Sequence, residues 1–332
     1  MRRCVQHSPM GESEEWAFPE ELRPDAGEAR FDLEAALDAV VLLRAEVPED
    51  AFTAQILGTE RAGNGVVIRD GLVLTIGYLI TEANAVWLTT NHGTAVAGFP
   101  LAYDQASGFG LVQPLGRLDL PALERGSSAS SEVGDDVVVA GHGGAAHALK
   151  ARVFAKREFA GYWEYVLDEA LFTAPAHPNW GGTALIDADG RLLGIGSLLV
   201  QEEMRGKQMQ GNMMVPIDLL DPILDDLLRY GRVNRPARPW LGMYATEVEG
   251  QLAVAGLAPR GPSERAGLQV GDVLLEVAGR RAKGLAELFR GVWALGPAGV
   301  DVPVSVRRNG DTLRFAVHTA DRNDFLKKPH LH

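Results

Sequence analysis

The 332-residue sequence has one cysteine, Cys4, and no apolar run long enough to cross a membrane. A single cysteine excludes any internal disulfide, which fits a reducing compartment. The start of the chain, MRRCVQHSPMGESEEW, has two arginines but no apolar stretch behind them, so it does not resemble a secretory signal. From these absences we expect a cytoplasmic protein that does not contact a membrane.

An excess of basic residues is also lacking, since 44 acidic residues outnumber 32 basic ones and give a net charge of −12. Nucleic-acid binding needs a basic face that neutralises phosphates, so we expect no nucleic-acid partner. The eight histidines show no metal-ligand spacing, and we expect neither a metal site nor a cofactor.

Many short apolar runs separated by turn residues are present instead. Asp70-Gly71, Asn91-His92-Gly93 and Asp187-Ala188-Asp189-Gly190 are good hairpin turns. This spacing, with little helix between, predicts a mainly β fold of the sandwich or barrel type. The expected strands are Gly65–Ile68, Val73–Leu79, Ala85–Leu88, Gly110–Val112, Asp136–Ala140, Ala151–Phe154, Tyr165–Phe172, Gly182–Ile186 and Leu192–Leu199.

The pattern also suggests domain boundaries. Residues 1–30 form an acidic extended arm whose large apolar anchors, Trp16 and Phe18, could pack on the body or on a neighbouring subunit. One convincing helix is expected over Ile217–Tyr230, opened by Pro216. We place a first domain over residues 31–230, a Pro/Arg-rich linker over 231–239, a second domain over 240–320 and a tail over 321–332.

Three segments of the first domain, residues 63–75, Asp104–Val112 and His177–Leu185, together resemble motifs of the HtrA family of trypsin-like serine proteases. Residues 63–68 read GNGVVI and are followed by RDGLVLT, which is similar to the opening of the first barrel in that family. Asp104–Val112 and His177–Leu185 resemble the segments around the catalytic aspartate and serine. By this resemblance, the positions of the catalytic histidine, aspartate and serine hold Tyr78, Gly108 and Trp180.

The resemblance therefore implies a double β-barrel without a catalytic triad. A nucleophilic serine needs an adjacent base, and that base needs an orienting acid. A tyrosine with an ordinary pKa of about 10 is a poor base at neutral pH, a glycine has no side chain and an indole has no nucleophilic atom. The loop before Trp180 is also one residue short, which affects the oxyanion hole.

Two alternatives stay open at this point. Other residues could rebuild a site, and the candidates in this region are His92, His142, His177, Ser107, Ser127 and Ser128. Trp180 itself could plug the former cleft as core, or it could offer an aromatic platform to a partner.

Two segments of the second domain, Trp240–Met243 and residues 262–280, together resemble a bacterial PDZ domain. Trp240-Leu241-Gly242-Met243 is similar to the loop that opens such domains, and residues 262–280, PSERAGLQVGDVLLEVAGR, follow the family motif almost position by position. A PDZ domain captures a peptide C-terminus, with loop N–H groups on the carboxylate. By resemblance we expect Trp240, Leu241, Gly242 and Met243 to form that loop, and Leu288, Phe289 and Val292 to line the side-chain pocket. The groove helix is expected over Ala286–Leu295.

The leading hypothesis is a pseudoprotease that binds protein C-termini or unfolded polypeptide and regulates other proteins. An active HtrA relative is one possible partner, and the resemblance implies a homo-oligomer, a trimer in most HtrA proteases. The alternatives are a serine endopeptidase with an unrecognised nucleophile, or a chaperone-like holdase.

Overall fold

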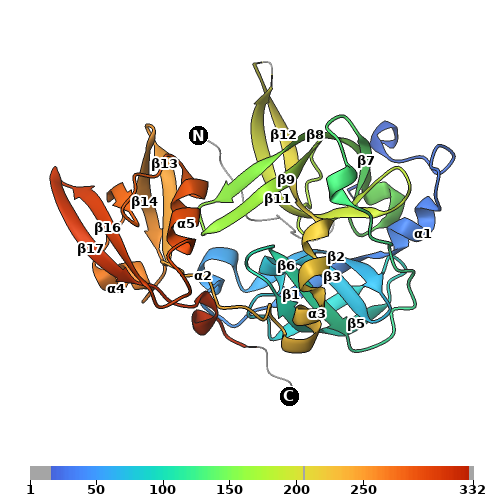
Figure 1. Ribbon diagram of the computed structural model, residues 1–332. Helices are drawn as coiled ribbons and strands as arrows, with labels where there is room; N and C mark the ends of the chain where they lie inside the picture. The colour runs from blue at the N-terminus through green and yellow to red at the C-terminus, as the bar shows by residue number, and fades with distance from the viewer. Residues whose placement is uncertain (1–15, 205, 329–332) are drawn as a thin grey trace. The chain divides into compact units, whose positions relative to one another are not determined.

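The computed structural model describes residues 16–204 and 206–328. Two compact units divide the chain (Figure 1). The first unit takes in residues up to 157, residues 169–233 and the tail from 327, and the second takes in residues 158–168 and 234–326. The first fifteen residues of the acidic arm lie outside the described residues.

Six antiparallel strands close the first barrel in the order β1-β2-β3-β6-β5-β4. Turns at Asp70-Gly71 and Asn91–Gly93 join neighbouring strands, as their sequences predict. The short helices of this region are α1 (Leu33–Asp38), α2 (Ala54–Leu57) and the 3₁₀ turn η2 (Gly77–Leu79). The strands are β1 (Val40–Glu46), β2 (Glu60–Arg69), β3 (Leu72–Ile76), β4 (Ala85–Thr89), β5 (Ala95–Tyr103) and β6 (Phe109–Pro114).

A second closed barrel follows, in the order β10-β11-β12-β9-β8-β7. Its core cluster includes Val139, Val153, Leu185 and Met214, all with no exposed surface. The double β-barrel expected from the sequence is therefore confirmed. The strands are β7 (Asp136–Ala140), β8 (Ala148–Gly161), β9 (Tyr165–Ala174), β10 (Ala184–Ile186), β11 (Leu192–Met204) and β12 (Lys207–Pro216).

The helix expected over Ile217–Tyr230 is divided in two. A 3₁₀ turn, η5, covers Ile217–Leu219, and the α-helix α3 covers Asp221–Tyr230. Pro222 lies in the first turn of α3, where its missing N–H costs nothing, and Gly231 ends the helix in the left-handed region with φ of 69°. Pro216 ends β12 and is also the N-cap residue of η5, so it precedes the 3₁₀ turn, as expected, and not the α-helix itself.

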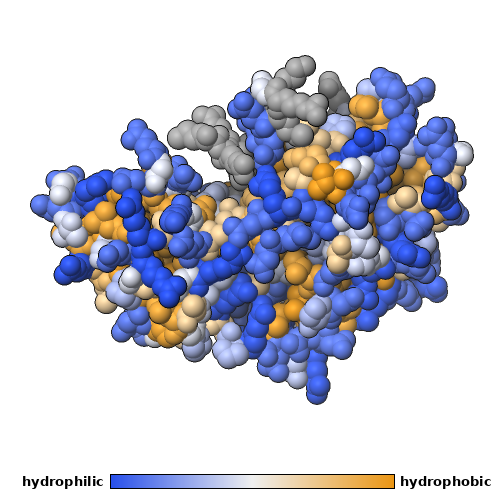
Figure 2. All heavy atoms as spheres, turned by 45° about the horizontal axis from the view of Figure 1, so that its top comes forward, coloured by the Kyte–Doolittle hydropathy of each residue, from blue (hydrophilic) through white to orange (hydrophobic). Residues whose placement is uncertain are grey.

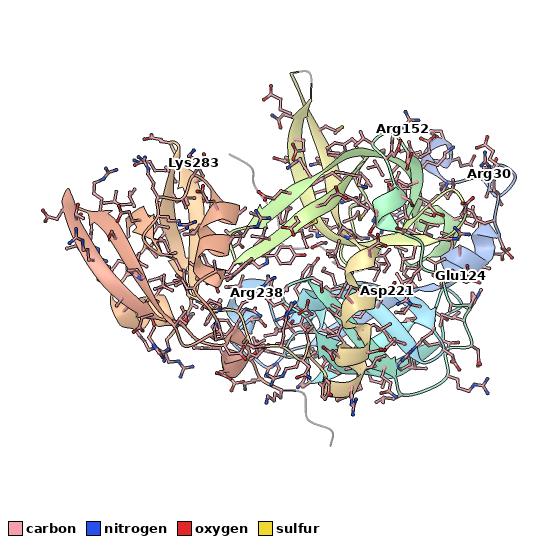
Figure 3. All side chains as sticks on the ribbon, viewed as in Figure 1. Arg30, Glu124, Arg152, Asp221, Arg238 and Lys283 are labelled. Carbon is pink, nitrogen blue, oxygen red and sulfur yellow. The ribbon has the colours of Figure 1, made fainter. Side chains whose placement is uncertain are left out.

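The second unit is a five-stranded sheet with helices α4 (Pro262–Ala266) and α5 (Leu285–Trp293). Helix α5 matches the expected groove helix to within two residues at its C-terminal end. Arg238 of the linker, labelled in Figure 3, lies over the ring of Trp293 at 4.3 Å. The strands are β13 (Met243–Val248), β14 (Gln251–Leu257), β15 (Val273–Val277), β16 (Asp301–Arg308) and β17 (Asp311–His318).

Charged and polar side chains cover most of the face shown in Figure 2, with apolar patches between them. The exposed large apolar side chains include Trp87, Leu115 and Val270, at 49%, 62% and 65% exposure. Within the described ranges, no helix is long and apolar enough to cross a membrane.

Candidate functional site

Tyr78 and Gly108 lie side by side at one end of the first barrel. Tyr78 is in η2, directly after β3, and the N–H of its neighbour Gly77 donates to the carbonyl of Gly108 at 2.7 Å. Gly108 has φ of 86°, and its own N–H donates to the carbonyl of Asp104 at 2.8 Å. The tight turn before β6 thus needs glycine here, and position 108 offers no side chain to the neighbouring tyrosine.

Trp180 comes from the second barrel and meets the same tyrosine. The Tyr78 hydroxyl donates to the carbonyl of Ser197 at 2.9 Å and accepts a hydrogen bond from the indole N–H of Trp180. Trp180 is 3% exposed. Burial raises the pKa of the Tyr78 hydroxyl further above its ordinary value, and the bond from Trp180 offsets part of this effect. Tyr78 and Trp180 therefore meet between the two barrels, and Gly108 bonds Gly77, the residue before Tyr78. The Tyr78 phenol stays protonated at neutral pH.

The loop around Gly181 and Gly182 is locked to the first barrel through Asn64. The backbone N–H of Asn64 donates to the carbonyl of Gly181 at 2.8 Å, and its side-chain amide donates to the same carbonyl at 3.0 Å. A Cβ on Gly182 would lie 1.9 Å from the Asn64 carbonyl oxygen. Glycine is required at this close approach of two backbones.

Several N–H groups of this loop already have acceptors inside the chain. Gly182 donates to the carbonyl of Gly196 at 2.8 Å, Thr183 to the carbonyl of Trp180 at 3.2 Å, and Asn179 to Nδ1 of His177 at 3.1 Å. An oxyanion hole needs convergent N–H groups that are free to meet a developing negative charge. These three N–H groups already donate to acceptors within the chain.

His177 is buried beneath the described part of the N-terminal arm. Its ring is 5.7 Å from the Trp16 ring and 5.2 Å from the Phe18 ring, and the N–H of Phe18 donates to the carbonyl of Ala146 at 2.9 Å. Because Nδ1 accepts from Asn179, the proton sits on Nε2, which donates to the carbonyl of His147 at 3.0 Å. Of the two options left open by the sequence, the arm's aromatic anchors pack on the body of the chain.

Burial lowers the pKa of His177 to about 4, and the hydrogen bond to His147 offsets part of this shift. His177 is thus neutral under ordinary conditions, and both ring nitrogens are engaged. The other two histidines considered as alternatives lie in loops. His92 contacts the Asp38 carboxylate at 3.1 Å, and Nε2 of His142 is 3.2 Å from the carbonyl of Thr90.

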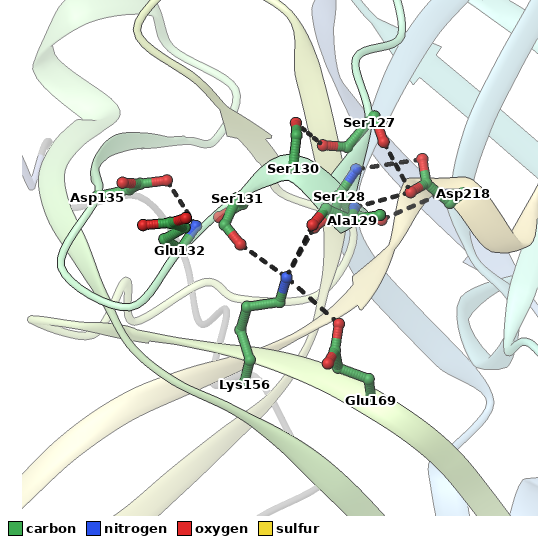
Figure 4. A network of polar contacts seen from close by, with 10 residues as sticks. All are labelled: Ser127, Ser128, Ala129, Ser130, Ser131, Glu132, Asp135, Lys156, Glu169 and Asp218. Atoms are coloured by element: carbon green, nitrogen blue, oxygen red, sulfur yellow. Dashed lines mark hydrogen bonds and ion pairs between the residues drawn. The ribbon is translucent and has the colours of Figure 1, made fainter.

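Ser127 and Ser128 belong to a polar network centred on Asp218 (Figure 4). The Ser127 hydroxyl donates to the Asp218 carboxylate at 3.0 Å, and the Ser128 hydroxyl accepts from the Asp218 N–H at 3.3 Å. Lys156 donates to the carbonyls of Ser128 and Ser131 in the same network. Among residues 16–204 and 206–328, neither of the two hydroxyls bonds a histidine ring. In this part of the chain the network therefore closes a loop and does not assemble a nucleophile with its base.

Ser107 serves the turn before β6. Its N–H donates to the Asp104 carboxylate at 2.7 Å, and its hydroxyl accepts from the N–H of Phe109 at 3.2 Å. Across residues 16–204 and 206–328, no group of three or more His, Cys, Asp or Glu side chains is placed to hold a metal ion.

In the second unit, three consecutive backbone N–H groups converge on one carboxylate. The N–H groups of Leu241 and Gly242 donate to Glu164 at 3.0 and 2.8 Å, and that of Met243 donates at 3.3 Å. Gly242 has φ of 65°, which turns the loop so that successive N–H groups point the same way. The loop expected to hold a peptide carboxylate thus holds the side chain of Glu164.

Glu164 lies in the turn between β8 and β9 and is 6% exposed. Burial raises its pKa to about 7, while the three backbone hydrogen bonds and the charge of Arg322 act in the opposite direction. This residue was not predicted from the sequence. Its only signal is a lone acid within the aromatic turn Tyr162-Trp163-Glu164-Tyr165, because its partners follow 77 residues later.

The apolar residues expected to line the pocket are in the core of this unit. Leu288 is 2% exposed, and Phe289 and Val292 are fully buried. Their cluster also contains Val166 from β9. Trp240 is 5% exposed and packs on Phe325 with ring centroids 4.9 Å apart, so its side chain belongs to the packed interior next to the loop.

Comparison with known proteins agrees with both units. The model of the trypsin-like peptidase domain matches residues 63–195, and the PDZ domain model matches residues 239–319. Two solved structures of the HtrA-type protease AlgW with tripeptide, one of them a variant, superpose with TM-scores of 0.51 and 0.50 at 19% identity. They cover 92% of this chain and 97% and 99% of their own chains. This likeness supports the fold.

Curated relatives carry protease names. The probable periplasmic serine endoprotease DegP-like of Halomonas elongata is 26% identical over 279 residues, which is 80% of this chain and 57% of the relative. Protease Do-like 1, chloroplastic, of Arabidopsis thaliana is 26% identical over 335 residues, which is 92% of this chain and 74% of the relative. The serine endoprotease DegS of Haemophilus influenzae is 23% identical over 265 residues, which is 79% of this chain and 77% of the relative.

These relatives correct one expectation drawn from the sequence, the cellular location. The cytoplasmic location expected from the sequence is wrong, because DegP-like relatives at 26% and 27% identity are named periplasmic. The chain spans just over half the length of those two relatives, 57% in each case. It is a homologue of the HtrA/Deg serine proteases, built from a trypsin-like peptidase domain followed by a PDZ domain.

Proposed function

We propose that this HtrA homologue is a pseudoprotease that binds polypeptide C-termini through its PDZ domain. The observation that carries the proposal is the loop Leu241–Met243, whose three N–H groups already hold a carboxylate at 2.8 to 3.3 Å. A C-terminal carboxylate has the same two oxygens as a glutamate side chain and needs the same donors.

The absence of catalysis is proposed from the contacts of Tyr78 and Trp180. An active site of this type needs a base within hydrogen-bond reach of a nucleophile. Here a protonated tyrosine bonds a carbonyl of the second barrel, and a buried indole lies beside it. Gly108 leaves the position of an orienting acid empty of any side chain.

The relatives suggest where and with what the chain works. The periplasmic names of the DegP-like relatives support a secreted or periplasmic location. The tripeptide in the solved HtrA-type structures supports a peptide as ligand. Oligomerisation, either with further copies or with an active HtrA relative, is proposed by the same analogy.

Casein cleavage tests the catalytic half of the proposal. Purified protein and a Trp180→Ala variant are incubated with casein beside an active trypsin, and all three are treated with a fluorescent fluorophosphonate. We expect label and cleavage with trypsin only. Cleavage and labelling by the purified chain would establish a serine endopeptidase with another nucleophile, and Ser107, Ser127 and Ser128 would then be replaced one at a time.

Peptide binding tests the other half. A fluorescein-labelled Gly/Ser peptide that ends in Phe-Val is titrated with the protein, alongside the same peptide amidated at its C-terminus. Binding that amidation abolishes supports C-terminal capture. Suppression of aggregation of an unfolded protein, without any dependence on the peptide C-terminus, would instead indicate a holdase.

A further inference from the structure

We propose that Glu164 is an internal ligand of the PDZ domain, which an incoming polypeptide C-terminus must displace. This inference rests on the proposed function for the identity of the competitor. The occupied loop itself is a property of the chain and is testable without any peptide.

The first support is that Glu164 uses the whole donor set of the loop. The Leu241 N–H is shared between Oε1 and Oε2, and Oε1 also accepts from Gly242 and Met243. Leu241 is fully buried, Met243 is 1% exposed and Glu164 is 6% exposed. Water therefore has little access to these donors, and a second carboxylate can reach them only when the first leaves.

The second support is the backbone at Glu164, which has φ of 62°. This left-handed conformation is sparsely populated by residues other than glycine, asparagine and aspartate. The buried hydrogen bonds of the Glu164 side chain offset the cost of this conformation. Gly161 precedes the turn and lies against the indole of Trp163, because a Cβ on Gly161 would be 2.6 Å from that ring.

The third support is that the hairpin tip, residues 158–168, also makes apolar contacts with the rest of this unit. Val166 joins the cluster of Leu288, Phe289 and Val292. The ring of Tyr162 lies edge-on to that of Tyr244 in β13, with centroids 6.0 Å apart. The tip thus supplies a carboxylate for the loop and an aliphatic side chain for the core cluster of the same unit from one short segment.

Arg290 of helix α5 fixes the base of the hairpin tip. Its guanidinium donates to the carboxylates of Glu158 and Asp168, one on each strand of the hairpin. These pairs are exposed, so they add modestly to the contact and are weakened by salt. The buried contacts of Glu164 are the ones that a competing carboxylate must replace.

Displacement is favoured by the desolvation of Glu164. Its pKa of about 7 reflects burial that the three hydrogen bonds do not fully offset, so the released side chain regains hydration. Only molecules in which Glu164 has left the loop can bind a peptide. The apparent affinity for the peptide is therefore the intrinsic affinity multiplied by the fraction of such molecules.

The test compares the wild-type chain with Glu164→Ala, Glu164→Gln and the control Glu276→Ala, an exposed carboxylate on β15. Hydrogen exchange at Leu241–Met243 is measured first, without peptide. We expect protection in the wild type and in Glu276→Ala, and loss of protection in Glu164→Ala. Equal exchange in the wild type and Glu164→Ala would overturn the inference. If the alanine variant does not fold, exchange at Leu241–Met243 is compared between the wild type and Glu164→Gln, and equal exchange in those two proteins would overturn it as well.

The labelled peptide ending in Phe-Val is then titrated into each variant. We expect Glu164→Ala to bind about tenfold or more tightly than the wild type, with Glu276→Ala unchanged. Equal affinity in the wild type and Glu164→Ala would overturn displacement. If no variant binds while the exchange difference persists, the internal ligand stands and capture of C-termini, the proposed function, falls.

Discussion

The hydroxyl of Tyr78 in the first barrel donates a hydrogen bond to the carbonyl of Ser197 in the second barrel, at 2.9 Å. Tyr78→Phe removes this bond and leaves a carbonyl without its donor. We expect a loss of about 1 kcal/mol in the free energy of unfolding, measured by urea denaturation. Tyr230→Phe, at a tyrosine 49% exposed, is the control and should leave stability unchanged. An unchanged midpoint for Tyr78→Phe would show that the bond contributes nothing.

Trp180 fills space that no smaller residue can fill. Trp180→Ala leaves a cavity beside Tyr78, and we expect a loss of about 3 to 5 kcal/mol in unfolding free energy. Trp87→Ala, at a tryptophan 49% exposed, should cost much less. Melting curves of the two variants, measured under the same conditions, compare these losses. Similar losses of stability in both variants would mean that Trp180 is not part of the packed interior.

His177 should make stability depend on pH. Its folded-state pKa is lowered to about 4, whereas the unfolded value is about 6.5. As the pH falls from about 6.5 to about 4, the unfolded chain binds a proton that the folded chain does not. Stability is therefore full above about pH 6.5 and falls by up to about 3 kcal/mol over that window.

Urea titrations at several pH values measure this dependence. His177→Gln has no titrating ring, so its stability should change less between about pH 6.5 and 4 than that of the wild type. His92→Gln, which removes a largely exposed histidine, should keep the wild-type slope. Identical slopes in all three proteins would assign the pH dependence to other groups.

Gly182 and Gly93 offer a matched pair for backbone strain. Both have positive φ, 77° and 83°, but a Cβ at Gly93 meets open space while one at Gly182 lies 1.9 Å from the Asn64 carbonyl oxygen. We expect Gly93→Ala to cost about 1 to 2 kcal/mol and Gly182→Ala to cost clearly more, or to prevent folding. Expression level and thermal melting compare the two, and equal losses would contradict the close contact.

The parts of the fold that the sequence predicts are those whose signals are local. Asp70-Gly71 and Asn91-His92-Gly93 specify hairpins by their own conformational preferences. Strand β5 escaped prediction because it contains Gly98 and Pro100, is largely half-exposed and is interrupted by a bulge after Pro100.

Strand β12 escaped for another reason. It carries polar residues such as Gln210 and Asn212. Asn212 is fully buried, and its side-chain amide is satisfied there because it accepts from the N–H of His177 and donates to the carbonyl of His177. A pattern of apolar residues cannot reveal such a polar strand.

The candidate sites divide in the same way. The Gly-containing loop at Leu241–Met243 could be predicted from its own residues. Its occupant could not, because the contact with Glu164 spans 77 residues and only folding brings the two segments together. Likewise, the sequence places Tyr78 and Trp180 in separate motifs, and only the closed barrels make them neighbours.

The bonds of Asn64 also bear on the order of events during synthesis. Its partners in the second barrel, Asn179 and Gly181, follow it by 115 and 117 residues. The strands of the first barrel lie within residues 40–114 and can pair while the rest of the chain is still being made. We therefore expect the Asn64 amide to bond water while the first barrel stands alone, and to exchange that water for the carbonyls of Asn179 and Gly181 when the second barrel folds.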